Sequence, residues 1–293
     1  MPQSGSQIVK KLLIALIFIA GVVSAQPLPV RWDELVASDW AKAIELSKGT
    51  CLLPIGILEK HGPHLPIGSD LIGAQARARE SAAREYVVVF PEYYFGQIYE
   101  AKYGEGTVAL PPELISKVLQ ATVDEIARNG FKKILIYSSH GGNPHWLRFF
   151  VQTQLDKRRD YVVYYFDPAP DSEYTKEFQK YRKTPLAGDE HAGEQETSRI
   201  LAIRPELVKL DRAGREDGSD QKRLADMPNL WTAVSWYARF PNHYAGVGAA
   251  ANVEEGKFSN EHITKMLVQA IRNVKNDQAT PAIQKENYDR QLK

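Results

Sequence analysis

Three short segments of this 293-residue chain combine residue types that bind metal ions and move protons. The first contains Glu59, His61 and Asp70, together with two glycines and two prolines. Glu59 and His61 are two positions apart, so in extended chain their side chains point the same way. The glycines and prolines allow the backbone to turn so that Asp70 returns toward them. Carboxylates and imidazoles together suit Zn²⁺, Mn²⁺ or Fe²⁺.

The second segment is 138–143, in which His140 precedes two glycines that let the backbone approach a ligand closely. The third is 189–198, where His191 and Glu196 could both face one pocket. Each segment also has an ordinary structural explanation: a surface pair, a tight turn, or an acidic helix start that complements the helix dipole. The metal interpretation is favoured because the first two segments both follow predicted strands.

Apolar strands alternate with amphipathic helices along the chain. Strands are predicted at 51–58, 86–90, 133–137 and 161–166, and helices at 71–84, 111–129, 144–158, 172–183, 193–203 and 259–276. This alternation predicts an α/β fold with a mostly parallel sheet covered by helices on both faces. Ligand sites in such sheets lie outside the carboxyl ends of the strands. We expect irregular structure at 211–252, Ser259 as a helix cap, and a loose polar tail at 277–293.

The first 25 residues have the order of a secretory signal peptide. Lys10 and Lys11 precede an apolar run at 12–20, and small residues follow at 23–25. An uncleaved membrane anchor is the alternative. We expect residues 26–293 to form one exported, periplasmic domain with no stable membrane span. The formal net charge of +1 gives no reason to expect nucleic acid as a partner. The single cysteine, Cys51, is expected to be buried in a strand, with a catalytic thiol as the second interpretation.

The motifs EKHGPHLPIGSD, SHGGN and HAGEQETS, with the fainter late stretch GAAANVEEG, together resemble the creatininase (creatinine amidohydrolase) family. The resemblance spans about 52–257. It implies a three-layer α/β/α fold, a homohexamer and a site for two divalent metal ions, Zn²⁺, Mn²⁺ or Fe²⁺. The combination of motifs is far more specific than any one of them.

The resemblance also implies roles for individual residues. Glu59 and His140 would hold one metal ion, His61 the other, and Asp70 would bridge them. In creatininase a glutamate lies two residues after the metal-binding histidine, where this chain has a glycine, so Glu196 is the expected replacement. His191 corresponds to the catalytic histidine that shuttles a proton, and Glu196 would complete that machinery. A further histidine, His64, is expected either to orient a ligand or to pack.

The function implied is hydrolysis of a non-peptide C–N bond in a small-molecule amide, either cyclic or a formamide. Creatinine itself is doubtful as the substrate, because this chain has no tryptophan between Trp146 and Trp231. Trp231 and Trp236 are expected to line the pocket, to pack in the core or to lie at an interface. Three alternatives stay open: a peptidase acting on small peptides, a phosphate-ester hydrolase, and a non-catalytic exported binding protein. The second is disfavoured because no arginine or lysine cluster is evident around the motifs.

Overall fold

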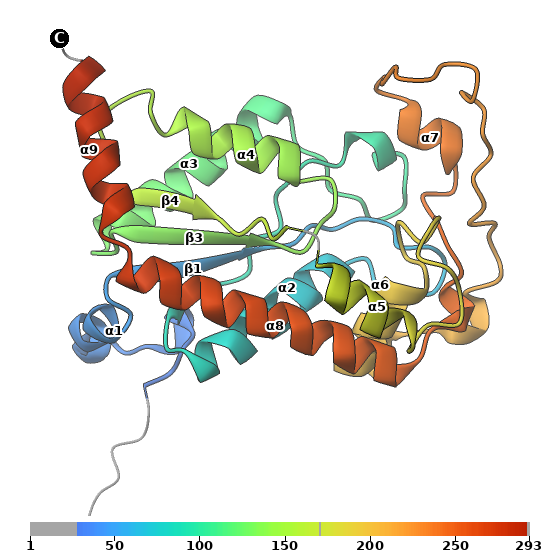
Figure 1. Cartoon of the computed structure of the whole chain (residues 1–293), viewed down its shortest axis with the longest axis horizontal. Coiled ribbons are helices and arrows are strands. Elements are labelled where there is room, and N and C mark those ends of the chain that lie inside the picture. Colours follow the sequence, from blue (N-terminus) through green and yellow to red (C-terminus); the bar gives the residue numbers. More distant parts are fainter. Residues whose placement is uncertain (1–27, 170, 292–293) are drawn as a thin grey trace, which may run out of the picture.

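A computed structural model describes residues 28–169 and 171–291 (Figure 1). The predicted signal peptide at 1–25 lies outside the described residues. Among the described helices, none is both long and apolar enough to cross a membrane.

A parallel sheet of four strands forms the centre of the fold, in the order β2-β1-β3-β4. The strands are β1 (Thr50–Ile55), β2 (Val88–Val89), β3 (Lys133–Ser138) and β4 (Val162–Tyr165). Thr50 pairs with Lys133 and Ile55 with Ser138, so β1 and β3 end together at the same edge. The loops after these two strands carry the first two polar segments.

Helices cover both faces of this sheet, which explains why its strands are apolar on both sides (Figure 1). One face packs against α1 (Trp40–Leu46), α3 (Pro112–Arg128) and α4 (Pro144–Thr153), and the other against α2 (Ser69–Arg84) and α8 (Val253–Asn276). Within β1, Leu53 points into the first core and Leu52 into the second. The predicted three-layer α/β/α fold is confirmed.

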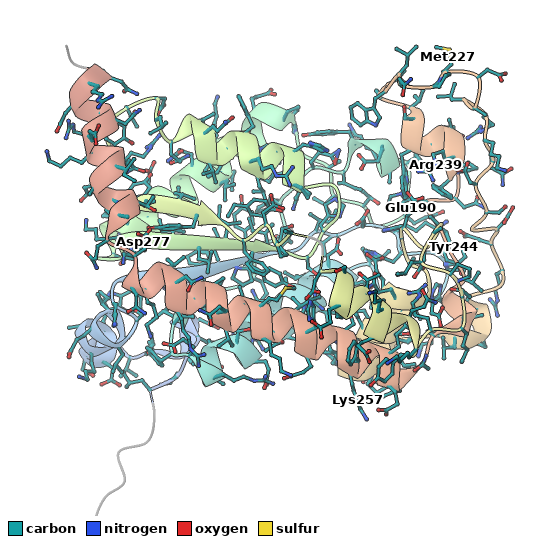
Figure 2. The ribbon with its side chains drawn as sticks, in the orientation of Figure 1. Glu190, Met227, Arg239, Tyr244, Lys257 and Asp277 are labelled. Carbon is teal, nitrogen blue, oxygen red and sulfur yellow. The ribbon has the colours of Figure 1, made fainter. Side chains whose placement is uncertain are left out.

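The remaining helices lie after the sheet in the sequence. They are α5 (Ser172–Gln179), α6 (Glu194–Ile203), α7 (Ser235–Arg239) and α9 (Ala279–Gln291). Helix α7 belongs to the predicted irregular segment, most of which has no regular structure. Figure 2 shows Met227 at the outer end of this segment, with Arg239 and Glu190 further in. Arg239 donates from Nη1 to Glu190 Oε2 at 2.9 Å and so ties α7 to the loop before α6.

Two predictions in the carboxyl-terminal part were wrong. Helix α8 begins at Val253, where the side chain of Asn252 accepts a hydrogen bond from the Glu255 amide, so Ser259 is buried inside the helix and is not its cap. The supposedly loose tail forms α9. The Tyr288 hydroxyl donates to the carbonyl of Gln154 at 2.7 Å, which anchors this helix although its sequence is polar.

Cys51 lies in β1 and is fully buried, as predicted. Burial raises the pKa of its thiol above the usual range. A buried, protonated thiol is a poor nucleophile, so the catalytic interpretation of Cys51 is excluded.

Candidate metal centre

The carboxyl ends of β1 and β3 bring the first two polar segments together. Glu59 and His61 follow β1, and His140 follows β3. Asp70 lies in the first turn of α2, and the start of that helix packs directly on Gly56. A Cβ atom at Gly56 would overlap the backbone of Asp70 and Leu71, so glycine is required for this close approach. The turn therefore returns Asp70 to Glu59, as predicted.

His140 lies between two carboxylates and a backbone carbonyl. Its Nε2 is 2.8 Å from the carbonyl oxygen of Gln97. A carbonyl only accepts, so Nε2 carries a proton and the neutral ring presents the lone pair of Nδ1 on its other side. Nδ1 is 2.8 Å from Glu59 Oε1 and 3.2 Å from Asp70 Oδ2. These acceptor atoms repel one another unless a cation, either a proton or a metal ion, lies among them.

His61 repeats this arrangement. Its Nδ1 lies 3.1 Å from the backbone carbonyl of Glu59, so Nδ1 donates and the Nε2 lone pair faces inward. Nε2 is 3.6 Å from Asp70 Oδ1, 3.9 Å from Glu59 Oε1 and 4.0 Å from Glu196 Oε2. Asp70 thus faces His61 with one oxygen and His140 with the other. This is the geometry of a bridging carboxylate.

His191 and Glu196 reach the same centre from the loop before α6 and from that helix. His191 Nε2 lies 2.9 Å from the carbonyl of Lys60, which leaves Nδ1 as the basic nitrogen, 3.7 Å from Glu196 Oε2. Between them Ala192 has a left-handed backbone (φ +55°), and its amide donates to Glu196 Oε2 at 2.6 Å. This strained turn directs both side chains to one point, and such strain is concentrated at functional sites.

His243 also belongs to this centre, and the sequence analysis missed it. It lies in the irregular segment, and backbone pairing between His191 and Ala245 holds it there. The indole N–H of Trp236 donates to His243 Nδ1 at 2.8 Å, so His243 Nε2 carries the proton and donates to Glu59 Oε2 at 2.6 Å. These two hydrogen bonds, from Trp236 to His243 and from His243 to Glu59, hold Glu59 with Oε1 directed at His140. A histidine in a glycine-rich loop was the only sequence signal.

Metal affinity is expected to fall when the hydrogen bonds from Trp236 to His243 and from His243 to Glu59 are removed. Trp236→Phe keeps the ring but removes the N–H donor, and His243→Ala leaves Glu59 Oε2 without its partner. Losing an outer partner of a metal ligand weakens metal binding by about 10- to 100-fold. Competition with a chromogenic chelator measures this affinity, and Trp231→Phe, on a side chain that is 86% exposed, is the matched control. Unchanged affinity in both test variants would show that these hydrogen bonds do not position Glu59.

The charges of these buried groups depend on one another. Burial alone would raise the pKa of Glu59, but His140 and His191 beside it hold this pKa well below its usual range. Burial opposes a charge on His61, yet the carboxylates of Asp70, Glu59 and Glu196 outweigh it and raise the pKa to about 10. His140 is raised in the same way, chiefly by Glu59 against burial. Without a metal ion, protons therefore take the place of the cation.

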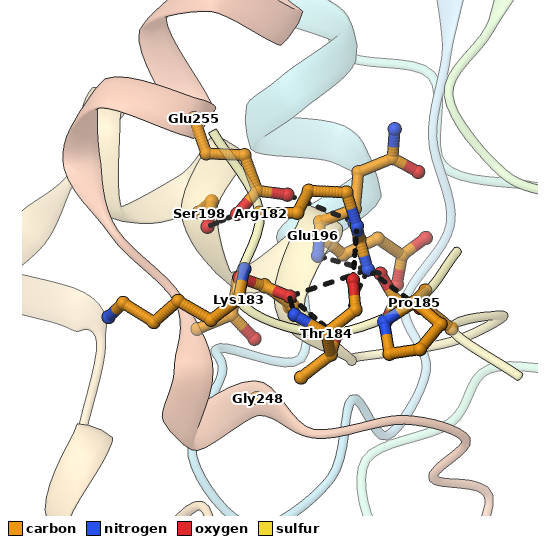
Figure 3. A network of polar contacts seen from close by, with 12 residues as sticks. Arg182, Lys183, Thr184, Pro185, Glu196, Ser198, Gly248 and Glu255 are labelled. Atoms are coloured by element: carbon orange, nitrogen blue, oxygen red, sulfur yellow. Dashed lines mark hydrogen bonds and ion pairs between the residues drawn. The ribbon is translucent and has the colours of Figure 1, made fainter. Parts of the chain in front are cut away.

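A buried ionic network braces the start of α6 (Figure 3). Arg182 contacts Asp189 at 2.6 Å, Glu255 at 3.0 Å and Glu194 at 3.5 Å. Glu194 in turn accepts from the backbone amides of Lys183 and Thr184. Figure 3 shows Glu196 beside this network. The helix that carries Glu196 is thus attached to both α8 and the preceding loop.

His64 packs outside the cluster. Its Nε2 lies 2.8 Å from the hydroxyl of Thr197, its ring lies edge-on to Tyr244, and burial lowers its pKa to about 4. Of the two roles expected for His64, the structure supports packing. Gly142 lies against Nε2 of His140 and against Gln97, so any side chain at that position would displace one of them.

The donor set fits divalent cations. Glu59 Oε1, His61 Nε2 and Asp70 Oδ2 are buried without hydrogen-bond partners among the described residues. Ligand atoms about 2.1 Å from a tetrahedral metal ion lie about 3.4 Å apart, close to the 3.2 and 3.6 Å separations found here. In the part of the chain that the structure describes, three residue groups have ligand atoms within 4.8 Å of one another: Glu59–Asp70–His140, His61–His191–Glu196 and Glu59–His191–His243. The structure thus brings together all six predicted site residues.

A cavity of about 1160 Å³ adjoins this cluster on the side of α7. Its lining includes Gln97, Glu100, Gly142, Trp146, Trp231 and Trp236. Gln97 holds His140 and Trp236 holds His243, so the cavity wall is continuous with the groups that orient the centre. Both tryptophans singled out in the sequence line this cavity. Burial raises the pKa of Glu100, which is a polar group in a largely apolar wall.

The fold and the site together define a class: three-layer α/β/α proteins with a buried carboxylate–histidine centre beyond the carboxyl ends of a parallel sheet. A family model described as "Creatininase: Creatinine amidohydrolase" matches residues 34–271. This chain belongs to the creatininase family, which is a family of hydrolases.

Relatives of known function differ in the reaction they catalyse. The chain is 28% identical over 193 residues to creatinine amidohydrolase from Pseudomonas putida, covering 61% of this chain and 74% of the relative. It is 29% identical over 188 residues to the mycofactocin precursor peptide peptidase of Mycobacterium ulcerans, covering 61% and 67%. It is 23% identical over 246 residues to 3-dehydro-scyllo-inosose hydrolase from Thermotoga maritima, covering 76% of each.

Solved structures support the fold. A creatininase described with Mn superposes with a TM-score of 0.70 at 21% identity, covering 85% of this chain and 99% of that one. A creatininase mutant of Zn–Zn type gives 0.71 at 21% identity, covering 86% and 100%. At this level of identity the likeness establishes the architecture, and the chemistry is argued from the residues of this chain.

Proposed function

We propose that this protein is an exported, metal-dependent hydrolase that cleaves the C–N bond of a cyclic amide or a formamide with water. One observation carries the proposal. His61 and His140 each donate a hydrogen bond from one ring N–H to a backbone carbonyl. The other ring nitrogen of each, which carries a lone pair, faces carboxylate oxygens, which are also hydrogen-bond acceptors. Both corners need a cation, and together they suit a pair of divalent ions.

In this proposal Glu59 and His140 would hold one ion, His61 and Glu196 would hold the other, and Asp70 would be shared between them. The relatives described with Mn and with Zn–Zn support these two metals as candidates, with Fe²⁺ as a third. Bound divalent ions lower the pKa of a water molecule and polarise a carbonyl group.

His191 moves the proton. Its Nε2 is held by the carbonyl of Lys60, so Nδ1 is the nitrogen that faces the centre, close to Glu196. At Nδ1 the imidazole accepts a proton from the attacking water and returns it to the leaving nitrogen. The Ala192 amide fixes Glu196 and so preserves this orientation. A purely structural metal site has no need of such a base, which argues against the non-catalytic alternative.

The large cavity is proposed as the substrate pocket. Its apolar wall, with Trp231 and Trp236, suits the body of an organic amide, and Gln97 and Glu100 offer polar contacts. A volume of about 1160 Å³ is much larger than a creatinine-sized molecule needs. This size favours a second candidate, a short peptide, and one relative is described as a peptide peptidase.

Location and assembly follow from the sequence expectations. Residues 1–25 would direct the chain to the periplasm and be removed, and six copies would assemble as the family resemblance implies. Cell fractionation with mass determination of the mature chain tests the first proposal. Light scattering tests the second.

A substrate panel distinguishes the candidate reactions. Lactams, formamides, N-acyl compounds and short peptides are offered to protein loaded with Mn²⁺ or Zn²⁺, and released amine is measured. We expect turnover of a non-peptide amide, lost on chelation and restored by metal, and His191→Ala is expected to lower kcat by about 100- to 10,000-fold. The control is His262→Ala in α8, where the His262 ring stacks against Tyr174 of α5. Cleavage of peptides alone would favour the peptidase, and no turnover by the reconstituted protein would favour the binding protein.

A further inference from the structure

Two arginines lie beside the metal centre, and neither of them lines the large cavity. Arg77 comes from α2 and Arg199 from α6. Both line a small cavity of about 20 Å³ whose wall also includes His61, Asp70 and Glu196. Arg77 is only 4% exposed. The expectation that no arginine cluster lies near the motifs was wrong, because the two arginines are 122 positions apart in the sequence and only the packing of α2 against α6 brings them together.

Neither guanidinium has a carboxylate partner within 4.0 Å in the described parts of the chain. Arg77 donates to neutral groups: the Tyr137 hydroxyl at 2.5 Å, the Asn260 side chain at 2.8 Å, and the Ser139 hydroxyl. Arg199 donates from Nε to the Ser259 hydroxyl at 2.8 Å. Arg182, by contrast, has three carboxylates around it. Arg77 is buried and Arg199 is partly exposed, and neither has the carboxylate partner that buried arginines normally have.

The charges around Arg199 act in opposite directions. Burial lowers the pKa of Arg199 and the positive charge of Arg77 lowers it further, whereas Tyr174 and Glu196 raise it without reversing the shift. The carboxylates that share the cavity wall, Asp70 and Glu196, face His61 and the remaining ligand atoms. Glu196 Oε2 also accepts from the Ala192 amide. The two arginines thus line a small polar space without a direct ion pair to either carboxylate in its wall.

The size of this space limits what can enter it. A cavity needs roughly 10–15 Å³ to hold one water molecule, so about 20 Å³ admits one water-sized ion. Gly73 forms part of the wall, and a Cβ there would meet the Arg77 guanidinium, so glycine keeps space for that group. A halide fits, and so does one end of a formate-sized carboxylate, whereas tetrahedral oxyanions are too large.

We propose that Arg77 and Arg199 form a binding site for one small monovalent anion, a halide or a formate-sized carboxylate, beside the metal centre. The site neutralises the arginine pair and is separate from the substrate cavity. It does not depend on the proposed reaction, because it is argued from the two arginines and their cavity and not from a bound metal ion.

Bromide tests this proposal. The full-length protein, both metal-loaded and chelated, is melted in sodium bromide or sodium gluconate at equal ionic strength. At ten times its dissociation constant bromide is expected to raise Tm by about 3 °C. The rise should be lost in Arg199→Met and kept in Arg204→Met, a matched change on an exposed side chain just beyond α6. A rise in both the loaded and the chelated protein separates this result from any failure of the metal proposal.

Anomalous scattering from bromide-soaked crystals of the unmodified protein provides the direct test, whatever the stability of the variants. We expect a peak between Arg77 and Arg199 that formate displaces and sulfate does not. Dissolved halide and a carboxylate released by hydrolysis share this chemistry, and displacement of the peak on adding product would identify the second source. No peak, or an equal Tm rise in Arg199→Met, would overturn the proposal, and displacement by sulfate would overturn its size limit.

Discussion

Asp70→Asn is expected to abolish activity and to reduce the metal content from two ions to one or none. Asp70 faces His140 with one oxygen, at 3.2 Å, and His61 with the other, at 3.6 Å, so both proposed ions share it. Asparagine has the same shape but offers one neutral oxygen. Loss of even an outer partner of a metal ligand lowers activity by about 10- to 100-fold, so loss of a bridging ligand should lower kcat by more than about 100-fold. Metal analysis and steady-state kinetics measure the two effects.

Asp211→Asn is the control, because this aspartate is exposed and its nearest cation, Arg215, lies 3.8 Å away at the surface. The circular dichroism of both variants should match that of the parent chain. If Asp70→Asn keeps two ions and full activity, Asp70 is not the bridge. Glu59 and Glu196 would then be the carboxylates assigned as ligands of the two ions.

Metal binding is expected to release about two protons at pH 7.5, one each from His61 and His140. In the metal-free protein both imidazole rings are positively charged, with a proton on each ring nitrogen, because the nearby carboxylates raise their pKa, that of His61 to about 10. A metal ion needs the same lone pairs. The release is measured with an indicator dye in weak buffer, and affinity should fall as the pH falls. His61→Asn should reduce the release to about one proton, and no release from the parent chain would contradict the raised pKa values.

The same shifts fix how stability depends on pH. A raised pKa gives His61 a contribution that is complete below its ordinary pKa of 6.5 and is lost as pH rises toward about 10. His64 and His243 have pKa values lowered to about 4, by burial, so their contribution is present above 6.5 and is lost as pH falls toward 4. Glu59, with a lowered pKa, adds a contribution that is lost at still lower pH. The metal-free protein should therefore be most stable near pH 6.5.

Bound metal removes the alkaline half of this dependence, since the lone pairs of His61 and His140 then hold cations that do not titrate. The gap in Tm between metal-loaded and chelated protein is expected to widen from pH 6.5 to pH 9. Thermal melts across this range measure the gap. A constant or narrowing gap would mean that metal binds elsewhere.

Much of the centre could be predicted from the sequence because strand ends and turns are local features. Continuous apolar strands placed Glu59, His61 and His140 at one edge of a sheet. The glycines and prolines before Asp70 indicated a return of the chain. Glu196 was predicted from its motif, and the strained turn at Ala192 is the physical reason that its side chain lies beside His61 and His191.

The parts that escaped prediction depend on contacts between distant segments. His243 and Trp236 lie where no hydrophobic period exists, and ion pairs such as that of Arg239 with Glu190 hold this segment in place. Arg77 and Arg199 look like ordinary helix residues until two helices meet. Helix α9 buries only Tyr288, so its sequence shows no apolar stripe from which a helix could be predicted.

Helix α9 lies at the opposite end of the sheet from α7 (Figure 1). It is attached to the beginning of β4, where the Gln284 amide donates to the carbonyl of Tyr161 at 2.8 Å. We expect amino acid changes in α9 to affect mainly the stability of the fold, and changes near α7 to affect mainly the proposed reaction. The two properties would then be open to separate selection, and α9 could be strengthened without altering the proposed active site.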